Sequence, residues 1–195
     1  MTISNAMICT TEALEQLLRK NLGRQRLAHS RRVAELAAEM CLALGLERGR
    51  GELAGLAHDW ARELPPQRVR ELALRDGRGE SNLEANYPVL LHGRAAAVAL
   101  KQHLGVEDEE VLEAVACHVT GSPGMGLLAK IVFVADFLEP GRGFVTEEVR
   151  RSMLRMNIDE MTVRVLEEIF SYLRSEQRPI AAPALELAEE LRSSW

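Results

Sequence analysis

The sequence lacks paired cysteines and any long apolar run. Its three cysteines, in 195 residues, show neither the spacing of a disulfide framework nor that of a metal-binding motif. This pattern is typical of reduced thiols, so we expect a cytoplasmic protein without a signal peptide. The longest apolar stretch, residues 127–138, is interrupted by a lysine and an aspartate. It falls well short of the roughly 20 residues that a transmembrane helix needs, so we expect no membrane partner.

The chain also lacks an excess of positive charge. Its formal net charge is -5 at pH 7, which disfavours a general polyanion-binding function, and we expect no nucleic-acid partner. Lysine is scarce, because the 24 basic residues include only Lys20, Lys101 and Lys130. Nearly all positive charge is therefore carried by arginine, whose planar guanidinium suits local, bidentate contacts with phosphate.

Strand-like alternation and internal repeats are absent, and a helical pattern runs along most of the chain. Apolar residues recur at helical spacing from Val33 to Leu44 and again from Leu53 to Leu64. Glycine, proline and asparagine signals separate the other predicted helices, which lie around residues 66–75, 93–103, 108–119, 125–138, 146–155, 158–176 and 183–193. The sequence therefore predicts an all-α fold.

The length and the hydrophobic content of 47% are sufficient for one substantial core. We assign residues 1–10 to an N-terminal tail, and we interpret the residues before Met7 as an expression remnant. Residues 11–177 form the main domain, and a proline-containing joint separates them from a C-terminal amphipathic helix, residues 178–195. The apolar stripe of that helix either packs on the main domain or contacts a second subunit in a homodimer.

Asp136 is the only polar side chain in residues 131–138. A charge placed among so much apolar surface is costly unless a partner compensates it. A metal ion is the preferred partner, because the chain also carries histidines and a second aspartate in apolar helical patterns. A purely structural helical protein would leave the aspartate among Phe, Val and Leu without an explanation.

Four of the five histidines occupy positions that favour a common centre. His29 and His118 lie on inward apolar stripes, and the adjacent His58 and Asp59 lie within another apolar segment. Taken singly, each such histidine is more often a hydrogen-bonded core residue than a ligand. His58 and Asp59 diverge by about 100° on an ideal helix, so other elements must complete a site. The candidate metal ligands are His29, His58, Asp59, His92, His118 and Asp136.

Four motifs occur in a fixed order along the chain. They are Ala-Gly-Leu-Ala-His-Asp-Trp-Ala-Arg-Glu-Leu at residues 54–64, Leu-His-Gly-Arg at 91–94, His-Val-Thr-Gly at 118–121 and Val-Ala-Asp-Phe-Leu-Glu-Pro-Gly-Arg at 134–142. The series resembles the HD-domain metal-dependent phosphohydrolases, and in particular the YqeK-type symmetrical bis(5'-nucleosyl)-tetraphosphatases. The last motif is the most specific. Many HD proteins share the His-Asp pair, but few of them follow the final aspartate of the series with Glu-Pro-Gly-Arg. The resemblance covers residues 24–175.

The resemblance implies an HD-domain helical bundle around a dinuclear metal site that hydrolyses diadenosine tetraphosphate symmetrically to two ADP molecules. It implies two divalent or mixed-valence metal ions, with iron as the first choice. On chemical grounds imidazole and carboxylate ligands suit manganese or another transition metal as well. The resemblance assigns His29, His58, Asp59 and Asp136 to one metal, and it assigns Asp59, as a bridge, with His92 and His118 to the second.

Further site residues follow from the same motifs. Asp59 or Asp136 would orient the attacking water, and Arg62 would act beside them in the catalytic set by matching phosphate charge. Arg142, after the Glu-Pro-Gly break, would reach the same cleft. The alternative for both arginines is an ordinary solvated residue or a surface ion pair. The candidate substrate-binding residues are Arg62, Thr120, Gly121 and Arg142.

The chain departs from the family pattern near these residues. Arg62 stands where relatives often carry lysine, and Val119 replaces a usual threonine. The segment after His92 also lacks a second glycine that is often found there. These departures remove no metal ligand, so they bear on substrate preference and turnover.

Two other functions remain open at this stage. The same ligands suit hydrolysis of another nucleotide phosphoester, such as a nucleoside monophosphate, because the pocket wall sets the substrate. The domain is alternatively a non-catalytic sensor of a nucleotide or metal. His103 matches no motif, and we expect it at the surface near a helix end.

Overall fold

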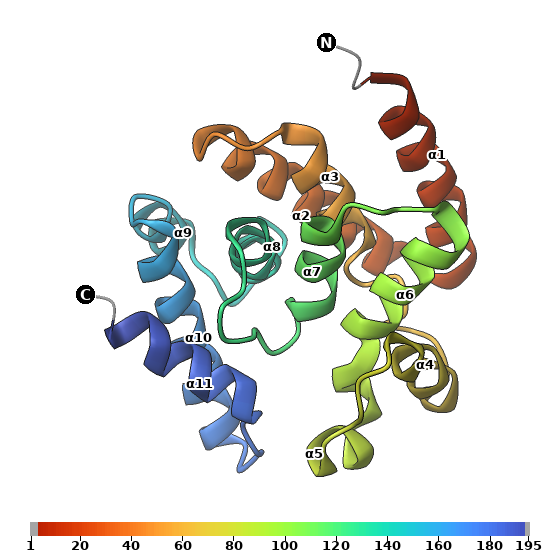
Figure 1. Ribbon diagram of the computed structural model, residues 1–195. Helices are drawn as coiled ribbons and strands as arrows, with labels where there is room; N and C mark the ends of the chain where they lie inside the picture. Colours follow the sequence, from red (N-terminus) through yellow and green to blue (C-terminus); the bar gives the residue numbers. More distant parts are fainter. Residues whose placement is uncertain (1–3, 194–195) are drawn as a thin grey trace.

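The computed structural model describes residues 4–193, with side chains described from residue 13 onward (Figure 1). Within this range every regular element is a helix, which confirms the all-α prediction. The elements are α1 (Ser4–Asn21), α2 (Arg24–Ala43), α3 (Arg48–Ala57), α4 (Pro66–Ala73), η1 (Leu74–Asp76), α5 (Asn82–Asn86), η2 (Pro88–Leu91), α6 (His92–Leu104), α7 (Glu109–Cys117), α8 (Leu127–Leu138), α9 (Glu147–Met153), α10 (Ile158–Ser175) and α11 (Ala182–Ser193). None of these described helices is both long and apolar enough to cross a bilayer.

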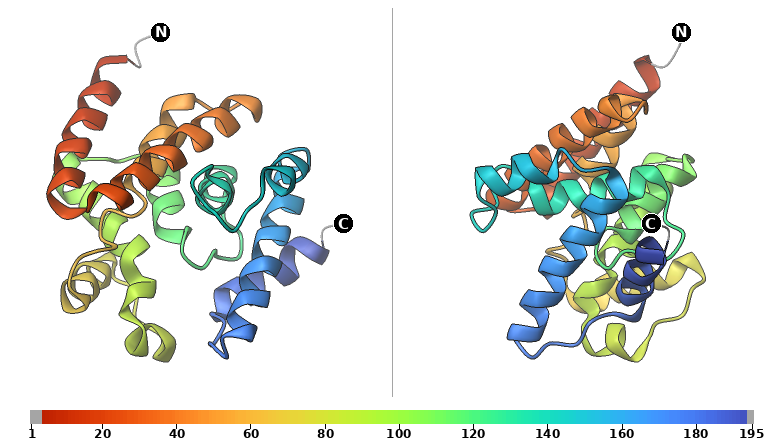
Figure 2. Two further views of the ribbon diagram at one scale, coloured as in Figure 1. Left: turned by 180° about the vertical axis from the view of Figure 1, so that it is seen from behind. Right: turned by 90° about the vertical axis from the view of Figure 1, so that its left-hand side faces the viewer.

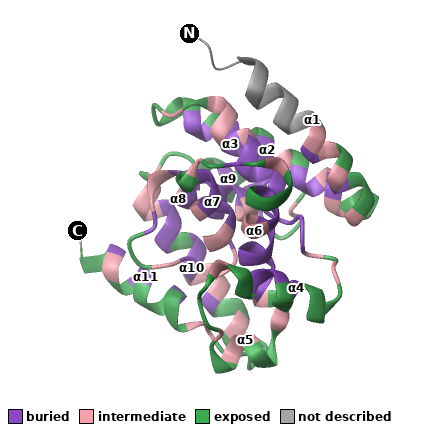
Figure 3. Cartoon of the chain, turned by 45° about the vertical axis from the view of Figure 1, so that its right-hand side comes forward, coloured by how far each residue is buried: buried purple, intermediate pink, exposed green. Residues whose placement is uncertain are grey.

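Helix α8 runs through the middle of the molecule, and α2, α3, α7 and α10 surround it (Figures 1 and 2). Its sequence is apolar on almost every face, as expected of a helix with neighbours all around. Figure 3 shows buried residues concentrated in these central helices and exposed residues along the outer ones. Asp136, in the last turn of α8, is therefore held close to the core.

Helices α2 and α3 pack at very close range. A Cβ atom added to Gly55 would lie 2.7 Å from the Ala34 Cα, and one added to Gly51 would lie 2.6 Å from the Ala37 carbonyl oxygen. Glycine at these two positions lets the backbones approach. The close packing brings the end of α3, which carries the His-Asp pair, against the middle of α2.

The regular α-helix of α3 ends at Ala57, so the prediction of one helix from Leu53 to Leu64 was wrong at its C-terminal end. The following residues form tight turns with hydrogen bonds to carbonyls three residues earlier, such as Arg62 N to Asp59 O at 2.8 Å. Apolar spacing did not reveal this change, because Trp60 stays buried through the turns.

Helix α1 was not predicted from the sequence. It runs across the proposed boundary between residues 10 and 11, while residues 1–3 of the proposed tail lie outside the described part of the chain. Leu14, Leu18 and Leu22 are buried, and their spacing of four residues was the available signal. The helix contacts α2, α3 and α6.

The C-terminal helix α11 packs against α10 of the same chain. Its apolar stripe, which includes Leu187 and Leu191, is buried there. The stripe is thus covered by the chain's own domain, and a homodimer stays a prediction. Residues 194 and 195 lie outside the described range.

The short helices η1, α5 and η2 between α4 and α6 were also missed by the sequence prediction. Arg94, which is buried, joins this segment to α6 through a bidentate ion pair with Asp76, with distances of 2.8 and 2.9 Å. The same guanidinium donates to the carbonyls of Arg78 and Gly79. These contacts fix the segment that leads into His92, the first residue of α6.

Candidate metal centre

Three of the clustered histidines are oriented in the same way, each by a backbone carbonyl three residues earlier. Their Nδ1 atoms lie 2.6 Å from Gly55 O for His58, 2.6 Å from Val89 O for His92 and 2.7 Å from Val115 O for His118. Because a carbonyl oxygen only accepts, each Nδ1 carries the hydrogen. In the neutral ring the Nε2 lone pair is then free to bind a metal.

The fourth histidine, His29 in the second turn of α2, is oriented by a carboxylate. Its Nδ1 donates to Glu139 Oε1 at 3.0 Å, and Glu139 is only 1% exposed. Glu139 also accepts from Arg32 Nε and from the Gly141 amide, each at 2.5 Å. A Cβ atom at position 141 would meet the Arg32 guanidinium, so a side chain there would have to displace this end of Arg32, which holds Glu139.

The four Nε2 atoms form two close pairs. The His29 and His58 atoms lie 3.2 Å apart, and the His92 and His118 atoms lie 3.0 Å apart. If every Nδ1 carries the hydrogen, neither pair can share a proton without one ring becoming charged. Two such lone pairs at this separation repel each other unless a cation lies between them, which fits a metal-binding role.

Asp59 lies between the two histidine pairs and faces each with a different oxygen. Its Oδ2 is 3.3 Å from His58 Nε2 and 3.6 Å from His29 Nε2. Its Oδ1 is 3.0 Å from His92 Nε2 and 3.9 Å from His118 Nε2. A carboxylate placed in this way suits a bridge between two metals.

Asp136 completes the first group. Its Oδ1 lies 3.0 Å from His29 Nε2 and 3.7 Å from His58 Nε2. The six predicted ligands thus come together from five parts of the chain. Four of them lie at or just beyond helix ends, namely His58, Asp59, His92 and His118. Mixed imidazole and carboxylate donors fit a transition metal such as iron, manganese or zinc.

The electrostatics of the centre shift the pKa values of two histidines in opposite directions and keep the carboxylates charged. Burial disfavours the charged form of His58, but Asp59 and Asp136 outweigh this effect and raise its pKa to about 9. Burial lowers the pKa of His118 to about 3. Burial alone would raise the pKa of Asp136, but the neighbouring histidines His29 and His58 and the Arg142 guanidinium hold it well below its usual value. The pKa of Asp59 is also held well below its usual value, since the charge of His58 outweighs the effect of burial. Both carboxylates are therefore ionised at neutral pH and ready to attract a cation.

Three arginines reach the same region. Arg142 Nη2 lies 2.5 Å from Asp136 Oδ1, which places this predicted residue at the centre, and its Nε donates to Asp136 O at 2.9 Å. Arg26 Nη1 donates to Asp59 Oδ2 at 2.9 Å. Sequence reasoning missed Arg26, although its position three residues before His29 puts both on one face of α2. Arg62 lines the same cavity.

The cavity over these groups has a volume of about 780 Å³. Its lining includes both candidate catalytic aspartates and the arginines Arg26, Arg62 and Arg142. It also includes the aromatic side chains of Phe137, Phe144 and Tyr172. This volume lies in the range of about 300 to 1,000 Å³ that is usual for small-molecule sites.

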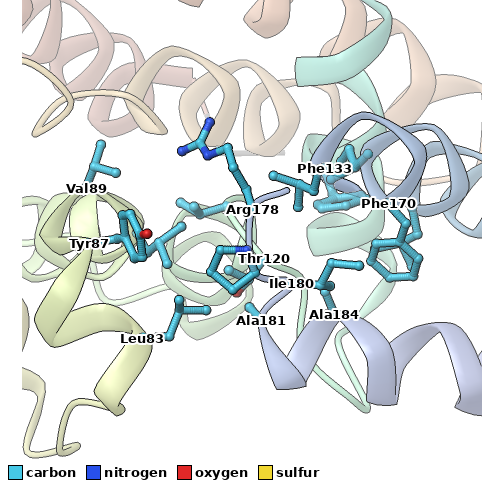
Figure 4. A pocket seen from close by; sticks show the side chains of 16 residues that line it. Leu83, Tyr87, Val89, Thr120, Phe133, Phe170, Arg178, Ile180, Ala181 and Ala184 are labelled. Atoms are coloured by element: carbon cyan, nitrogen blue, oxygen red, sulfur yellow. The ribbon is translucent and has the colours of Figure 1, made fainter. Parts of the chain in front are cut away.

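Two predicted substrate-binding residues lie away from this cavity. Thr120 lines a smaller, mainly apolar cavity of about 80 Å³, together with Tyr87 and Phe170 (Figure 4). Its hydroxyl donates to Gly121 O at 3.0 Å. Gly121 is buried with φ of 69° and packs against Leu187 of α11. The structure thus gives Gly121 a packing role, because a side chain there would collide with α11.

His103 is exposed in the last turn of α6, as expected. Its ring is 6.2 Å from that of Trp60, and it takes no part in the histidine cluster.

The sequence pattern of the HD domain matches residues 26–141, a span that contains all six clustered ligands. The chain belongs to the HD domain family. The predicted resemblance is therefore confirmed at the level of the family, and an HD domain binds divalent metal.

Three proteins show how closely this HD domain resembles others. A "Bis(5'-nucleosyl)-tetraphosphatase, symmetrical" of Halalkalibacterium halodurans is 30% identical over 90% of this chain and 94% of the relative. The protein of the same description from Bacillus subtilis is 27% identical over 84% of this chain and 87% of its own. A solved structure from Clostridium acetobutylicum, described as a predicted HD superfamily hydrolase involved in NAD metabolism, superposes with a TM-score of 0.87. It is 26% identical and covers 94% of this chain and 97% of its own.

Proposed function

We propose that this HD domain is a metal-dependent hydrolase that cleaves diadenosine tetraphosphate, and related dinucleoside polyphosphates, symmetrically into two nucleoside diphosphates. The observation that carries the proposal is the Asp59 carboxylate, whose two oxygens face different histidines, Oδ2 facing His58 and Oδ1 facing His92. The names of the two relatives from Halalkalibacterium halodurans and Bacillus subtilis supply the substrate class. The arginines around the cavity supply charges that match a polyphosphate.

We assign one metal to His29, His58, Asp59 and Asp136, and a second to Asp59, His92 and His118. When bound, two divalent cations supply an activated water at neutral pH and polarise a phosphoryl oxygen. Iron is our first choice of metal and manganese our second, because both accept imidazole and carboxylate ligands.

The chain's own groups position the reactants. Asp136, ionised at neutral pH, accepts a hydrogen bond and so orients the attacking water. Arg142 lies against this carboxylate and pairs with the phosphate that carries the developing negative charge. Arg26 and Arg62 line the same cavity and hold the remaining phosphates, since a guanidinium binds phosphate in a bidentate way.

Arg62 and Arg142 therefore keep the substrate-binding roles that their motifs predict. Thr120 is assigned no direct contact, because its hydroxyl donates to a neighbouring carbonyl outside the main cavity. The substitution of lysine by arginine at position 62 retains the positive charge while adding a planar, bidentate donor.

The alternative within enzymes is hydrolysis of a nucleoside monophosphate or another phosphoester, and the alternative outside enzymes is a nucleotide or metal sensor. Product analysis separates them. Metal-loaded protein is incubated under anaerobic conditions with diadenosine tetraphosphate and, in parallel, with AMP, and the products are resolved by chromatography. ADP as the only product from the first substrate supports the proposal. Phosphate release from AMP supports the alternative enzyme, and binding without any product supports a sensor.

A further inference from the structure

Phe144 is the most exposed aromatic residue that lines the metal-site cavity. Its exposed fraction is 65%, and Tyr172, 57% exposed, lines the same cavity from α10. A single exposed apolar side chain on a protein surface needs no explanation. Two exposed aromatic side chains do need an explanation when they line one cavity together with the candidate metal ligands and three arginines.

The segment that carries Phe144 is held firmly between α8 and α9. Val145 is buried, and Arg150, which is also buried, donates to the carbonyls of Leu138 and Val145. The Phe144 ring packs edge-on against Phe137, with ring centroids 5.3 Å apart. The ring thus already rests against Phe137 before any ligand binds, which reduces the conformational entropy lost when a ligand stacks on it.

Arg142 links this ring to the centre. Its guanidinium contacts the Asp136 carboxylate, and its Cζ atom lies 5.8 Å from the centroid of the Phe144 ring. A ligand with phosphates at the centre and a planar group at its end would meet the arginine first and the aromatic ring next. A nucleoside diphosphate half has this arrangement.

We propose, building on the hydrolysis of dinucleoside tetraphosphates proposed above, that Phe144 and Tyr172 form a stacking site for a nucleobase of the substrate. The two residues make the enzyme prefer nucleoside polyphosphates to polyphosphates without a base. Every base has a π-face, so such a site accepts different bases with modest preference.

The smaller cavity behind Thr120 is a poorer candidate for the base. Its volume is about 80 Å³, against about 780 Å³ for the cavity that contains Phe144. Tyr87, 41% exposed, lines the smaller cavity and not the cavity that contains Phe144, so it serves as a matched control.

The test compares binding of two probes, ADP and inorganic pyrophosphate, to the metal-loaded protein by isothermal titration calorimetry. Removal of a stacking ring costs a factor of roughly 5 to 150 in affinity. We therefore expect Phe144→Ala to raise the Kd of ADP by such a factor and to leave the Kd of pyrophosphate unchanged. Tyr172→Ala should act in the same direction, and Phe144→Trp should retain tight binding.

Two results would overturn the stacking site. One is a Phe144→Ala variant that binds ADP as tightly as wild type, and the other is an equal loss for ADP and pyrophosphate. A loss of ADP binding in Tyr87→Ala alone would place the base in the smaller cavity. If wild type binds ADP no better than pyrophosphate and does not cleave diadenosine tetraphosphate, the proposed function fails before any variant is considered.

Discussion

The substitution Glu139→Gln tests how the metal centre is supported. Glu139 is not one of the six candidate ligands and does not line the cavity, but it orients His29 through Nδ1 and is itself held by Arg32 and the Gly141 amide. A carboxylate accepts all of these bonds, whereas an amide turns two donor hydrogens toward at least one N–H group. Glutamine keeps the size of the side chain, so the change isolates charge and hydrogen bonding.

We expect two losses of different size from this change. Hydrogen bonds to charged groups contribute about 1.5 to 3 kcal/mol each, so the free energy of unfolding should fall by about 2 to 3 kcal/mol. Metal affinity should fall by roughly 10- to 100-fold, as is usual when the partner of a metal-binding histidine is removed. The first quantity is measured by urea denaturation of metal-free protein, and the second by competition for Mn²⁺ with a chelator of known affinity.

The matched control is Glu15→Gln, which breaks a more exposed ion pair with Arg31. Pairs of that kind contribute about 0 to 1 kcal/mol, so the free energy of unfolding should fall by no more than this amount. Glu15 lies outside the metal cluster, so the affinity for metal should not change. If Glu139→Gln behaves like this control in both measurements, the support of His29 by Glu139 is refuted.

Three further predictions follow from other parts of the fold. Asp59→Ala should abolish metal-dependent turnover and weaken metal binding at both sites, whereas His103→Ala should leave turnover intact. Steady-state assays measure the turnover, and metal analysis measures the bound metal. Gly55→Ala should lower the free energy of unfolding by about 1 to 3 kcal/mol, because its Cβ would meet the backbone of α2. Gly79→Ala should not lower it, because no atom lies within 4 Å of a Cβ at that position. Urea denaturation measures both changes. Burial alone would raise the pKa of Asp76, but its hydrogen bond with the buried arginine of α6 holds that pKa below the usual value. Its stabilising effect is thus fully present above the unfolded-state pKa of about 3.9 and is lost as the pH falls through the folded-state value. The stability difference between wild type and Asp76→Asn should therefore shrink below about pH 4, and an unchanged difference at pH 3 would contradict this assignment.

Sequence reasoning, with the family resemblance, predicted that these six candidate ligands would lie together, and the apolar segments around them were the signal from the residues themselves. Asp136 was conspicuous in an otherwise apolar helix, and the histidines fell on inward stripes. The split of the centre into two groups came from the family resemblance alone. The distances around Asp59 are consistent with that split, and no periodicity in the sequence contains this information.

Other features of the site were beyond prediction because they depend on contacts between distant segments. Arg26 reaches Asp59 only because α2 and α3 pack at glycine positions. Thr120 lines the smaller cavity instead of the main one, and the walls of that cavity come from α5, η2, α10 and α11, which the local motif does not encode. The end of α3 at Ala57 was missed because tight turns and an α-helix can bury the same apolar residues.

The most direct test of the central claim is an anaerobic titration of metal-free protein with Fe²⁺, in which bound metal and conversion of diadenosine tetraphosphate are measured in the same samples. We predict that turnover rises with metal content up to about two ions per chain, as a bridged dinuclear site requires. ADP should be the only product, and Asp59→Ala should give none. Turnover that is independent of bound metal, or equal in wild type and Asp59→Ala, would contradict the account.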